Sequence, residues 1–442
     1  MPILFGEAFS FDQTRPAPPA PADAVDERQV RVVIIGAGLA GLTCAFRLSQ
    51  ARCAQAGPAD LLVLEREAHV GGRIRSLAVE GVVVNLGAVT FQPRHYPRYM
   101  ALLADLGLAG RIRPVQRRDM VVGLGGRATR ADNAALAWDG VKGLFGQGVF
   151  TPAEAVGLLR FYVHMRRLTR PEGWDELMGL HAESVDAWAR RFGLGAGLRR
   201  KFVEPFVHFC FSGPERVSAA FGLYLLGFNL SHPATLDGGF CQVAEVMADR
   251  LPGRVETGAA VVAVQRVAGG FVTRYHQHGH CRRVRSQSLV AAVPASVAAQ
   301  LLPEMAARAA EVAYGHGQAT VVAGRLRAPF DLHLRRVDAP AGVAILGGEA
   351  QATRDGHVVN VLTYRGRCEP DHLRPLFVDG AFRVLADYAL CPAVAAPAPG
   401  QTPLPMEWGD GLFLAGDCTG LFPSQEAAVS SGEAVARQLI HD

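Results

Sequence analysis

Three glycines near the start of the chain have the spacing of a nucleotide-binding turn. The apolar run Val32–Ile35 leads into Gly36, Gly38 and Gly41, and apolar residues at helical spacing follow. The first glycine permits a sharp turn, the second lets backbone N–H groups approach a pyrophosphate, and the third lets helix and strand pack closely. The helix N-terminus adds a positive partial charge. We therefore expect a dinucleotide to bind at Gly36, Ala37, Gly38, Leu39, Ala40 and Gly41.

A carboxylate after the next strand strengthens this interpretation. The apolar run Leu61–Leu64 ends in Glu65, which is placed to accept hydrogen bonds from the two hydroxyls of an adenosine ribose. Its separation from the glycines is roughly thirty residues rather than the usual ~20, and we expect residues 51–60 to hold the excess as a long helix-to-strand loop. Because a carboxylate repels a 2′-phosphate, NADP is disfavoured. The alternative is that Glu65 only ends a strand at the surface.

The residues after Glu65 add a second glycine motif. Gly71, Gly72 and Arg73 follow a short loop, and with the first motif they resemble the FAD-dependent amine oxidoreductase and phytoene desaturase superfamily, which includes monoamine oxidases and protoporphyrinogen oxidases. The resemblance implies that these residues lie against the FAD pyrophosphate and isoalloxazine, with Glu65 and Arg66 also in the cofactor site. A planar guanidinium suits bidentate recognition of a pyrophosphate, and paired glycines let the backbone approach a flat ring.

Two further strands resemble parts of the same family. Residues 82–88 resemble the family's strand that ends in D-x-G beside the flavin, which implies that Gly87 and Ala88 contact the cofactor. Asn85 stands where Asp is usual, which removes a charge and leaves the backbone role intact. Residues 255–264 resemble the family's V-x-x-I strand, which implies that backbone groups at Val261 meet the adenine.

The end of the chain resembles the family's closing segment most closely. Residues 412–438 contain Gly416 and Asp417, and then a predicted helix that begins near Gln425. The resemblance implies that Asp417 holds a ribityl or pyrophosphate-side hydroxyl. It also implies that Gln425 and Ala427 open a helix whose dipole faces the pyrimidine edge of the flavin and stabilises negative charge on the reduced ring. FAD is therefore the expected cofactor, and no metal is expected.

The cofactor-matching segments are far apart in the sequence, so the cofactor domain must be built from discontinuous pieces. We expect an α/β fold in which a Rossmann-like FAD-binding domain is joined to an α+β substrate-binding domain, as in amine oxidases. The predicted parts are a flexible N-terminal arm over 1–29; FAD-binding segments over 30–95, 235–300 and 405–442; a mainly helical substrate segment over 96–234; and a second substrate segment over 301–404.

Local patterns predict the elements of the substrate segments. Thr151 and Pro152 are typical of a helix start, and residues 184–193 are expected to form a helix that ends at a glycine. The alternating runs over 319–325 and 358–364 predict strands of a substrate-domain sheet.

Charge, hydropathy and cysteine content exclude several classes of protein. The chain has 45 Lys+Arg against 41 Asp+Glu in 442 residues. The arginines are scattered among acids rather than clustered as in a nucleic-acid groove, so no nucleic acid is expected. No apolar span reaches the ~20 residues of a transmembrane helix, and the start does not have the pattern of a secretory signal. The eight cysteines form no C-x-x-C pair. We expect a cytoplasmic enzyme with a small-molecule substrate, and a homodimer stays open.

Two departures from the family pattern bear on the substrate. In this family the flavin accepts a hydride from a carbon beside nitrogen or from a C–C bond that is desaturated. Amine oxidases commonly keep a lysine bonded through water to the flavin, whereas the matching window, residues 314–324, has none and places Val321 near that position. Amino-acid oxidases carry an arginine for the substrate carboxylate, where this chain has Thr90, unless a shifted alignment brings in Arg94. Because threonine cannot form a bidentate ion pair with a carboxylate, a free amino acid is disfavoured.

Aromatic residues favour a lipophilic substrate, although an ordinary core is the competing interpretation for each of them. Phe422 is the only aromatic residue between Thr419 and Glu426. The helical segment adds Phe202, Phe206, Phe209, Phe211, Phe221, Tyr224 and Phe228. The titratable candidates near the suspected site are His95, His208, His232, Cys368 and Cys418. Each is more often structural than functional, so no catalytic residue is assigned.

The sequence therefore favours an FAD-dependent oxidoreductase that dehydrogenates, or desaturates, a lipophilic or aromatic metabolite. One alternative is an amine or protoporphyrinogen-type oxidase that produces hydrogen peroxide, because residues 213–219 resemble protoporphyrinogen oxidases. Another is a redox-neutral flavin-dependent isomerase or a non-catalytic flavoprotein. Only a dehydrogenase or an oxidase would bleach the flavin when substrate is added without oxygen.

Overall fold

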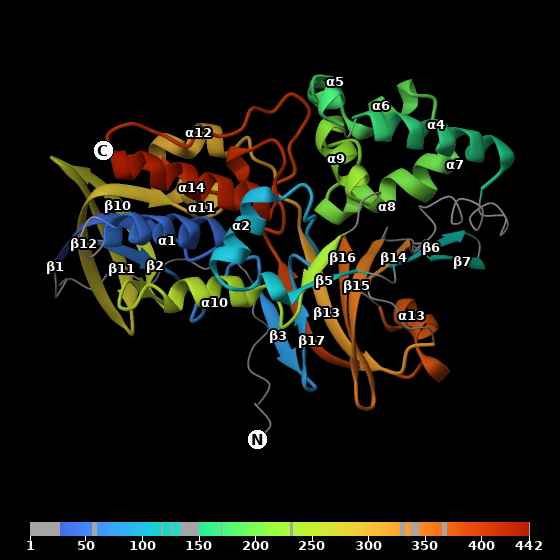
Figure 1. The fold of residues 1–442 in the computed structure, drawn as a ribbon, viewed down its shortest axis with the longest axis horizontal. Helices are drawn as coiled ribbons and strands as arrows, with labels where there is room; N and C mark the ends of the chain where they lie inside the picture. The colour runs from blue at the N-terminus through green and yellow to red at the C-terminus, as the bar shows by residue number, and fades with distance from the viewer. Residues whose placement is uncertain are drawn as a thin grey trace.

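The computed structural model describes residues 27–54, 60–115, 118–124, 127–132, 150–168, 170–229, 233–327, 332–336, 344–364 and 369–441. These residues form two large sheets and a separate group of helices (Figure 1). Residues 1–26, which make up most of the predicted N-terminal arm, lie outside the described residues.

The first sheet has a parallel core. Its strands are β1 (Glu27–Ile35), β2 (Leu61–Leu64), β9 (Val255–Glu256), β10 (Ala260–Val267), β11 (Gly270–Gln277), β12 (His280–Ala291) and β18 (Leu412–Leu414). The order β18-β12-β1-β2-β9 is parallel throughout, and β10 and β11 add an antiparallel ribbon to the first half of β12. Apart from Glu27–Gln29, which lie in the predicted flexible arm but form the start of β1, these strands come from the three segments predicted to bind FAD.

The alternation of side chains along β1 shows that this sheet is buried on both faces. Val32 and Ile34 belong to one core, whereas Val33 and Ile35 belong to another. A parallel sheet needs such cover, because its crossover helices lie against both faces. The covering helices are α1 (Leu39–Ala54), α2 (Pro97–Asp105), α10 (Cys241–Asp249) and α14 (Gln425–His441) on the first face, and α11 (Ala295–Leu301) and α12 (Ala306–Ala309) on the second.

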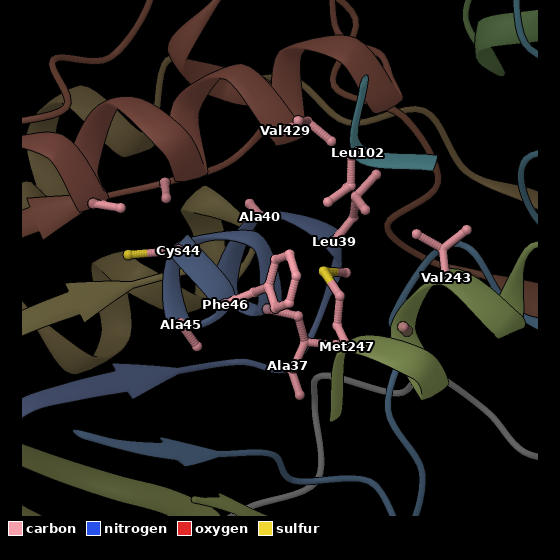
Figure 2. Close-up of a cluster of buried hydrophobic side chains, with 14 of the residues drawn as sticks. Ala37, Leu39, Ala40, Cys44, Ala45, Phe46, Leu102, Val243, Met247 and Val429 are labelled. Atoms are coloured by element: carbon pink, nitrogen blue, oxygen red, sulfur yellow. The ribbon is translucent and has the colours of Figure 1, made fainter. Parts of the chain in front are cut away.

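The helices of the first face meet in one apolar cluster. Figure 2 shows Phe46 of α1 and Met247 of α10 in this cluster, with Leu102 of α2 and Val429 of α14 on its other side. The helices α1 and α14 come close because α14 has Gly432 at their contact, where a Cβ would lie 2.4 Å from a backbone oxygen of α1. The last helix of the chain is thereby fixed against the first.

The second sheet is almost entirely antiparallel. Its order is β17 (Arg383–Leu390), β13 (Gly317–Gly324), β16 (Gly356–Tyr364), β15 (Ala344–Thr353), β14 (Leu332–Arg336), β6 (Arg118–Leu124) and β7 (Arg127–Asp132), and the pair β14–β6 is parallel. The hairpin of β3 (Ser76–Val79) and β4 (Val82–Asn85) packs Val84 against Val321 and Val358 of this sheet. A short pair, β5 (Ile112–Pro114) and β8 (Ala234–Leu236), lies beside it.

The helical group has its own core around Phe161, Trp188 and Phe221. Its members are α4 (Pro152–Leu168), α5 (Trp174–Gly179), α6 (Val185–Arg191), α7 (Ala196–Leu198), α8 (Glu204–Val207) and α9 (Ala219–Asn229); α13 (Pro370–Leu373) lies apart, near the second sheet. Thr151 caps α4 as expected, since its Oγ1 accepts the Glu154 N–H at 3.2 Å.

The expected α/β architecture with a Rossmann-like unit is confirmed, whereas two details differ. The helix α1 continues to Ala54, so the expected loop was wrong for residues 51–54, where no glycine or proline interrupts the helix; residues 55–59 lie outside the described part. The helix α2 falls in the predicted substrate segment 96–234, yet it packs Leu102 in the first core. The division into domains stays a prediction. No helix in the described ranges is long and apolar enough to cross a membrane.

Candidate functional site

The glycine turn between β1 and α1 combines a tight backbone with open space. Gly36 has φ +104°, and a Cβ there would lie 2.5 Å from the carbonyl oxygen of Ala292. Gly41 is equally constrained, because its Cβ would lie 2.1 Å from the Gly36 oxygen. Gly38 differs from both, since a Cβ on it would meet no atom within 4 Å. There is therefore room for a ligand beside Gly38, where the N-terminus of α1 favours negative charge.

Glu65 is tied to this turn rather than ending a strand at the surface. The side chain is 9% exposed. Its two carboxylate oxygens accept the N–H groups of Ala37 at 2.7 Å and Glu67 at 2.9 Å. Burial raises the pKa of Glu65 above its ordinary value, and the two N–H groups partly offset that effect. The alternative of a surface strand end is therefore wrong.

The second glycine motif lies directly across from the first. The N–H of Gly71 donates to the Ala37 oxygen at 2.9 Å. Gly71 and Gly72 have φ +112° and +54°, and a Cβ on Gly72 would lie 3.4 Å from the Cα of Gly38. Both positions therefore favour glycine, and they bring the following arginine to the edge of the turn.

Arg73 and Asp417 join the two ends of the chain. The Arg73 guanidinium donates to both carboxylate oxygens of Asp417, at 2.7 and 2.8 Å. The Asp417 side chain is 10% exposed and that of Arg73 35%. Burial would lower the pKa of Arg73, but the charge and hydrogen bonds of Asp417 outweigh burial and raise it. The ring of Tyr314 lies 6.0 Å from the Arg73 Cζ. The two parallel hydrogen bonds to Asp417 thus fix the orientation of the Arg73 guanidinium in the site.

The segment that follows Asn85, the last residue of β4, lies against the backbone of Arg73. A Cβ on Gly87 would lie 2.2 Å from the Arg73 oxygen, and the Ala88 N–H donates to the same oxygen at 3.4 Å. The side chain of Asn85 accepts hydrogen bonds from Ser76 Oγ and the Phe240 N–H, each at 2.8 Å. Asn85 therefore organises the local backbone without the charge that the family usually has here.

The start of α14 presents a buried donor with no acceptor. Ser424 caps this helix, because its Oγ accepts the Ala427 N–H at 3.2 Å, and the Gly416 N–H donates to Ser431 Oγ at 3.0 Å. Gln425 is 8% exposed, and its Nε2 has no hydrogen-bond partner within the described ranges. A buried amide needs an acceptor, and the carbonyl oxygens of a flavin pyrimidine ring are of that kind. Gln425 and the space beside Gly38 therefore fit a flavin nucleotide.

Two of the predicted cofactor residues lie at the margin of this site. Val261 lies on β10. The residue just before β10 is hydrogen-bonded to the end of β2, because the Ala259 N–H donates to the Glu65 carbonyl oxygen at 2.7 Å. Arg66 is half exposed and pairs with Glu67 at 3.1 Å. Their contact with a cofactor stays a prediction.

An aromatic cluster adjoins the first turn of α14. Phe422 lies with its ring centroid 4.4 Å from Tyr224 and 5.2 Å from Trp174, and the His95 ring is 6.4 Å from Tyr224. Trp174 is 43% exposed. Sequence reasoning found Phe422, Tyr224 and His95 separately and missed Trp174, because the four residues come from four separate segments of the chain. Burial and the charge of Arg94 lower the pKa of His95, which favours a neutral cluster.

The remaining candidates have mostly structural surroundings. Val321 is fully buried in an apolar cluster, and Arg94 is exposed. Burial raises the pKa of Cys418 to about 12, which disfavours a reactive thiolate. Apart from Tyr224, the aromatic residues of the helical segment whose side chains are described lie in hydrophobic cores. These residues are Phe202, Phe206, Phe211 and Phe221. The ring of His208 lies 4.9 Å from that of Tyr364. His232 and Cys368, and the side chains of Phe209 and Phe228, lie outside the described residues.

Comparison with known proteins places this chain in a family. The family described as flavin containing amine oxidoreductase matches residues 39–372. Human protoporphyrinogen oxidase is 26% identical over 316 residues, which are 62% of this chain and 62% of that protein. The structure of putrescine oxidase bound to putrescine superposes with a TM-score of 0.67 at 16% identity, over 94% of this chain and all of that chain. The CLA-producing fatty acid isomerase from P. acnes gives 0.68 at 18% identity, over 92% and 98%.

Proposed function

This chain belongs to the flavin-containing amine oxidoreductase family, and we propose that it is an FAD-dependent oxidoreductase that dehydrogenates an uncharged lipophilic or aromatic small molecule. The chain spans 62% of the length of the human relative that it matches, so the reaction is argued from the site. When bound, FAD supplies the hydride acceptor. The residues of this chain bind it, orient it and exclude water.

The glycine turn and the two ion-pairing residues would hold the cofactor. Gly38 and the N-terminus of α1 would receive the pyrophosphate, since that is where space and positive partial charge coincide. Glu65 would accept the ribose hydroxyls while it keeps the Ala37 N–H. Asp417 would hold Arg73 in one orientation, so that its exposed edge faces the cofactor. Gln425 would donate to the pyrimidine edge of the flavin.

The observation that carries the proposed substrate class is the aromatic cluster of His95, Trp174, Tyr224 and Phe422. It lies against the loop that leads into α14, and Phe422 is three residues before Gln425. The rings of this cluster are tilted or edge-on to one another, and an aromatic surface of this kind favours flat or apolar ligands. Val321, near the position where amine oxidases keep a lysine, is buried in an apolar cluster and supplies no charge. A carboxylate that entered without a cation would lose its hydration.

A second candidate is oxidation of a porphyrinogen-like ring with release of hydrogen peroxide. It is favoured by the 26% identity to human protoporphyrinogen oxidase. Such a ring is large and aromatic when oxidised, so it would also suit the cluster. The fatty acid isomerase shares only the fold at 18% identity, which keeps a redox-neutral reaction as an outcome of the test below.

Anaerobic mixing with candidate substrates tests the proposal. The purified holoprotein is mixed without oxygen with uncharged aromatic and polyene compounds, with a porphyrinogen, and with free amino acids and amines. We expect neutral lipophilic compounds to bleach the flavin absorbance, and amino acids at millimolar concentration to leave it unchanged. Rapid bleaching by a free amino acid contradicts the proposal, and conversion of a compound without bleaching indicates the isomerase instead.

A further inference from the structure

The first turn of α2 is capped by a residue of α14 rather than from within its own segment. The side chain of Tyr96 does not cap α2, and Pro97 occupies the first helical position. The next N–H groups of a helix have no partner inside the helix. Here the Arg98 N–H donates to Glu426 Oε1 at 3.1 Å and the Tyr99 N–H to Glu426 Oε2 at 2.9 Å. Glu426 therefore ties the start of α2 to the start of α14.

The charge of Glu426 is used differently from that of the next glutamate of α14. Glu433 forms ion pairs with Arg47 and Arg98, at 2.8 and 2.9 Å. Within the described residues Glu426 forms no such pair, and both of its carboxylate oxygens accept backbone N–H groups. Its negative charge lies at the positive end of the α2 dipole, which is a favourable position. Glu426 thus holds the α2 backbone itself, whereas Glu433 holds side chains.

A second contact joins the same two segments. The hydroxyl of Tyr96, the residue before α2, is hydrogen-bonded to the side chain of Ser424. Ser424 Oγ also donates to the Phe422 carbonyl oxygen at 3.0 Å and accepts the Ala427 N–H at 3.2 Å. The start of α2 and the loop that leads into α14 are therefore connected at two points, one through Ser424 and one through Glu426.

The two connected segments carry the residues to which the proposed function assigns ligands. His95 lies just before α2, and its ring is 6.4 Å from that of Tyr224. Phe422 lies just before α14, with its ring 4.4 Å from that of Tyr224. Gln425, the proposed donor to the flavin, directly precedes Glu426 in the chain. Burial raises the pKa of Tyr224, and the nearby charge of Glu426 adds to this effect. Glu426 therefore lies between the aromatic cluster and the proposed flavin contact.

We propose that Glu426 is a positioning residue for the substrate site. By binding the first N–H groups of α2, it sets the position of His95, and with it the shape of the aromatic cluster, relative to Gln425. Glu426 acts through the backbone of α2 and not by contact with the substrate. The inference rests on the proposed function, because the aromatic cluster is the proposed substrate site.

Substitution of Glu426 in the holoprotein tests this role. Binding of indole, an uncharged aromatic probe, is measured by the perturbation of the flavin spectrum, together with FAD affinity and thermal unfolding. Glu426→Gln keeps the size of the side chain, but its NH2 group can only donate and cannot accept one of the two N–H groups. We expect indole to bind roughly fivefold more weakly, an effect typical of a lost helix cap, with unchanged FAD affinity.

Two further variants separate positioning from simple stability. Glu433→Gln is the matched control, because it removes ion pairs with Arg47 and Arg98 from the same helix and leaves the α2 backbone contacts in place. It should lower only the melting temperature. The double variant Glu426→Gln/His95→Ala should bind indole no more weakly than His95→Ala alone, since effects that act through one group are not additive.

Each outcome supports or overturns the inference. Equal indole binding by wild type, Glu426→Gln and Glu433→Gln overturns it, as does an equal loss in both variants or an additive loss in the double variant. If Glu426→Gln fails to fold, Glu426→Asp decides, because its shorter side chain keeps the charge but cannot reach both N–H groups, and it must show the loss. A wild-type protein that does not respond to indole contradicts the proposed substrate class as well. Failure of the proposed function is therefore seen in the wild type, and failure of this inference alone only among the variants.

Discussion

Arg73 and Asp417 are 344 positions apart in the chain, yet their side chains form a bidentate ion pair with N–O distances of 2.7 and 2.8 Å. The pair links the second glycine motif to the turn after the last strand of the first sheet. Because both residues are polar groups in a largely enclosed site, each one alone would leave the other without its partner. The cofactor site is therefore complete only when both ends of the chain are folded.

Breaking this pair should weaken cofactor binding. In Asp417→Asn the side chain keeps its shape but loses its charge, so Arg73 is no longer held by two charge-assisted hydrogen bonds, each worth ~1.5–3 kcal/mol. We expect FAD affinity to fall at least tenfold, measured by fluorescence during reconstitution of the apoprotein. Arg190→Ala, which removes a surface pair with Asp186, is the control. Equal affinity for all three proteins would show that the pair is unrelated to FAD.

Alanine substitutions at Gly36 and Gly38 should have different effects, the first on folding stability and the second on FAD binding. Gly36→Ala combines an unfavourable φ of +104° with a contact at 2.5 Å, so we expect the protein itself to lose ~1–3 kcal/mol of stability or more. Gly38→Ala has open space around the new methyl group, so the apoprotein should unfold normally while FAD binding weakens. Chemical denaturation of the apoproteins, together with FAD titration, checks both expectations. Normal FAD binding by Gly38→Ala would mean that the pyrophosphate lies elsewhere.

Glu65 should make the apoprotein less stable as the pH rises. Its pKa in the folded protein is raised from the ordinary 4.5 by burial, so the folded state binds more protons than the unfolded state just above that pH. Stability attributable to this group is then complete below the unfolded pKa and is lost as the pH rises through the folded pKa. The free energy of unfolding of the wild type, measured relative to that of Glu65→Gln, should therefore fall as the pH rises from 4. Parallel pH profiles would refute it.

A substitution in the aromatic cluster should weaken substrate binding and leave cofactor binding unchanged. Trp174→Ala removes an exposed ring that lies tilted against Phe422, with the two ring centroids 5.2 Å apart, and a lost aromatic contact is worth ~0.5–1.5 kcal/mol. We expect several-fold weaker binding of aromatic ligands, measured by perturbation of the flavin spectrum, with unchanged FAD affinity. Val163→Ala, an exposed apolar residue of α4, is the matched control. If both variants bind ligands equally well, the cluster is not part of the substrate site.

Local geometry explains which parts of the site could be predicted from the sequence. Gly36, Gly41 and Gly71 occupy positions where a Cβ would clash or φ is positive, and such requirements leave a recognisable spacing. The N-terminal cap of α4 could also be predicted from the sequence, because Thr151 and Glu154 are three residues apart. The α/β class followed from buried strands that alternate with helices.

Contacts between distant segments could not be predicted in the same way. The Arg73–Asp417 pair and the position of Trp174 beside Phe422 depend on how separate elements pack. No spacing in the sequence encodes them. The extension of α1 to Ala54 was missed for a different reason, because propensity alone defines helix ends poorly.

The central claim is that both ends of this chain form one FAD site, and identification of the bound cofactor tests it most directly. The purified protein should be yellow, and heat or acid denaturation should release close to one FAD per chain, identified by chromatography and mass. Gly38→Ala and Asp417→Asn should each release less. A colourless protein that cannot be reconstituted with FAD, or one that releases only FMN, would contradict the account.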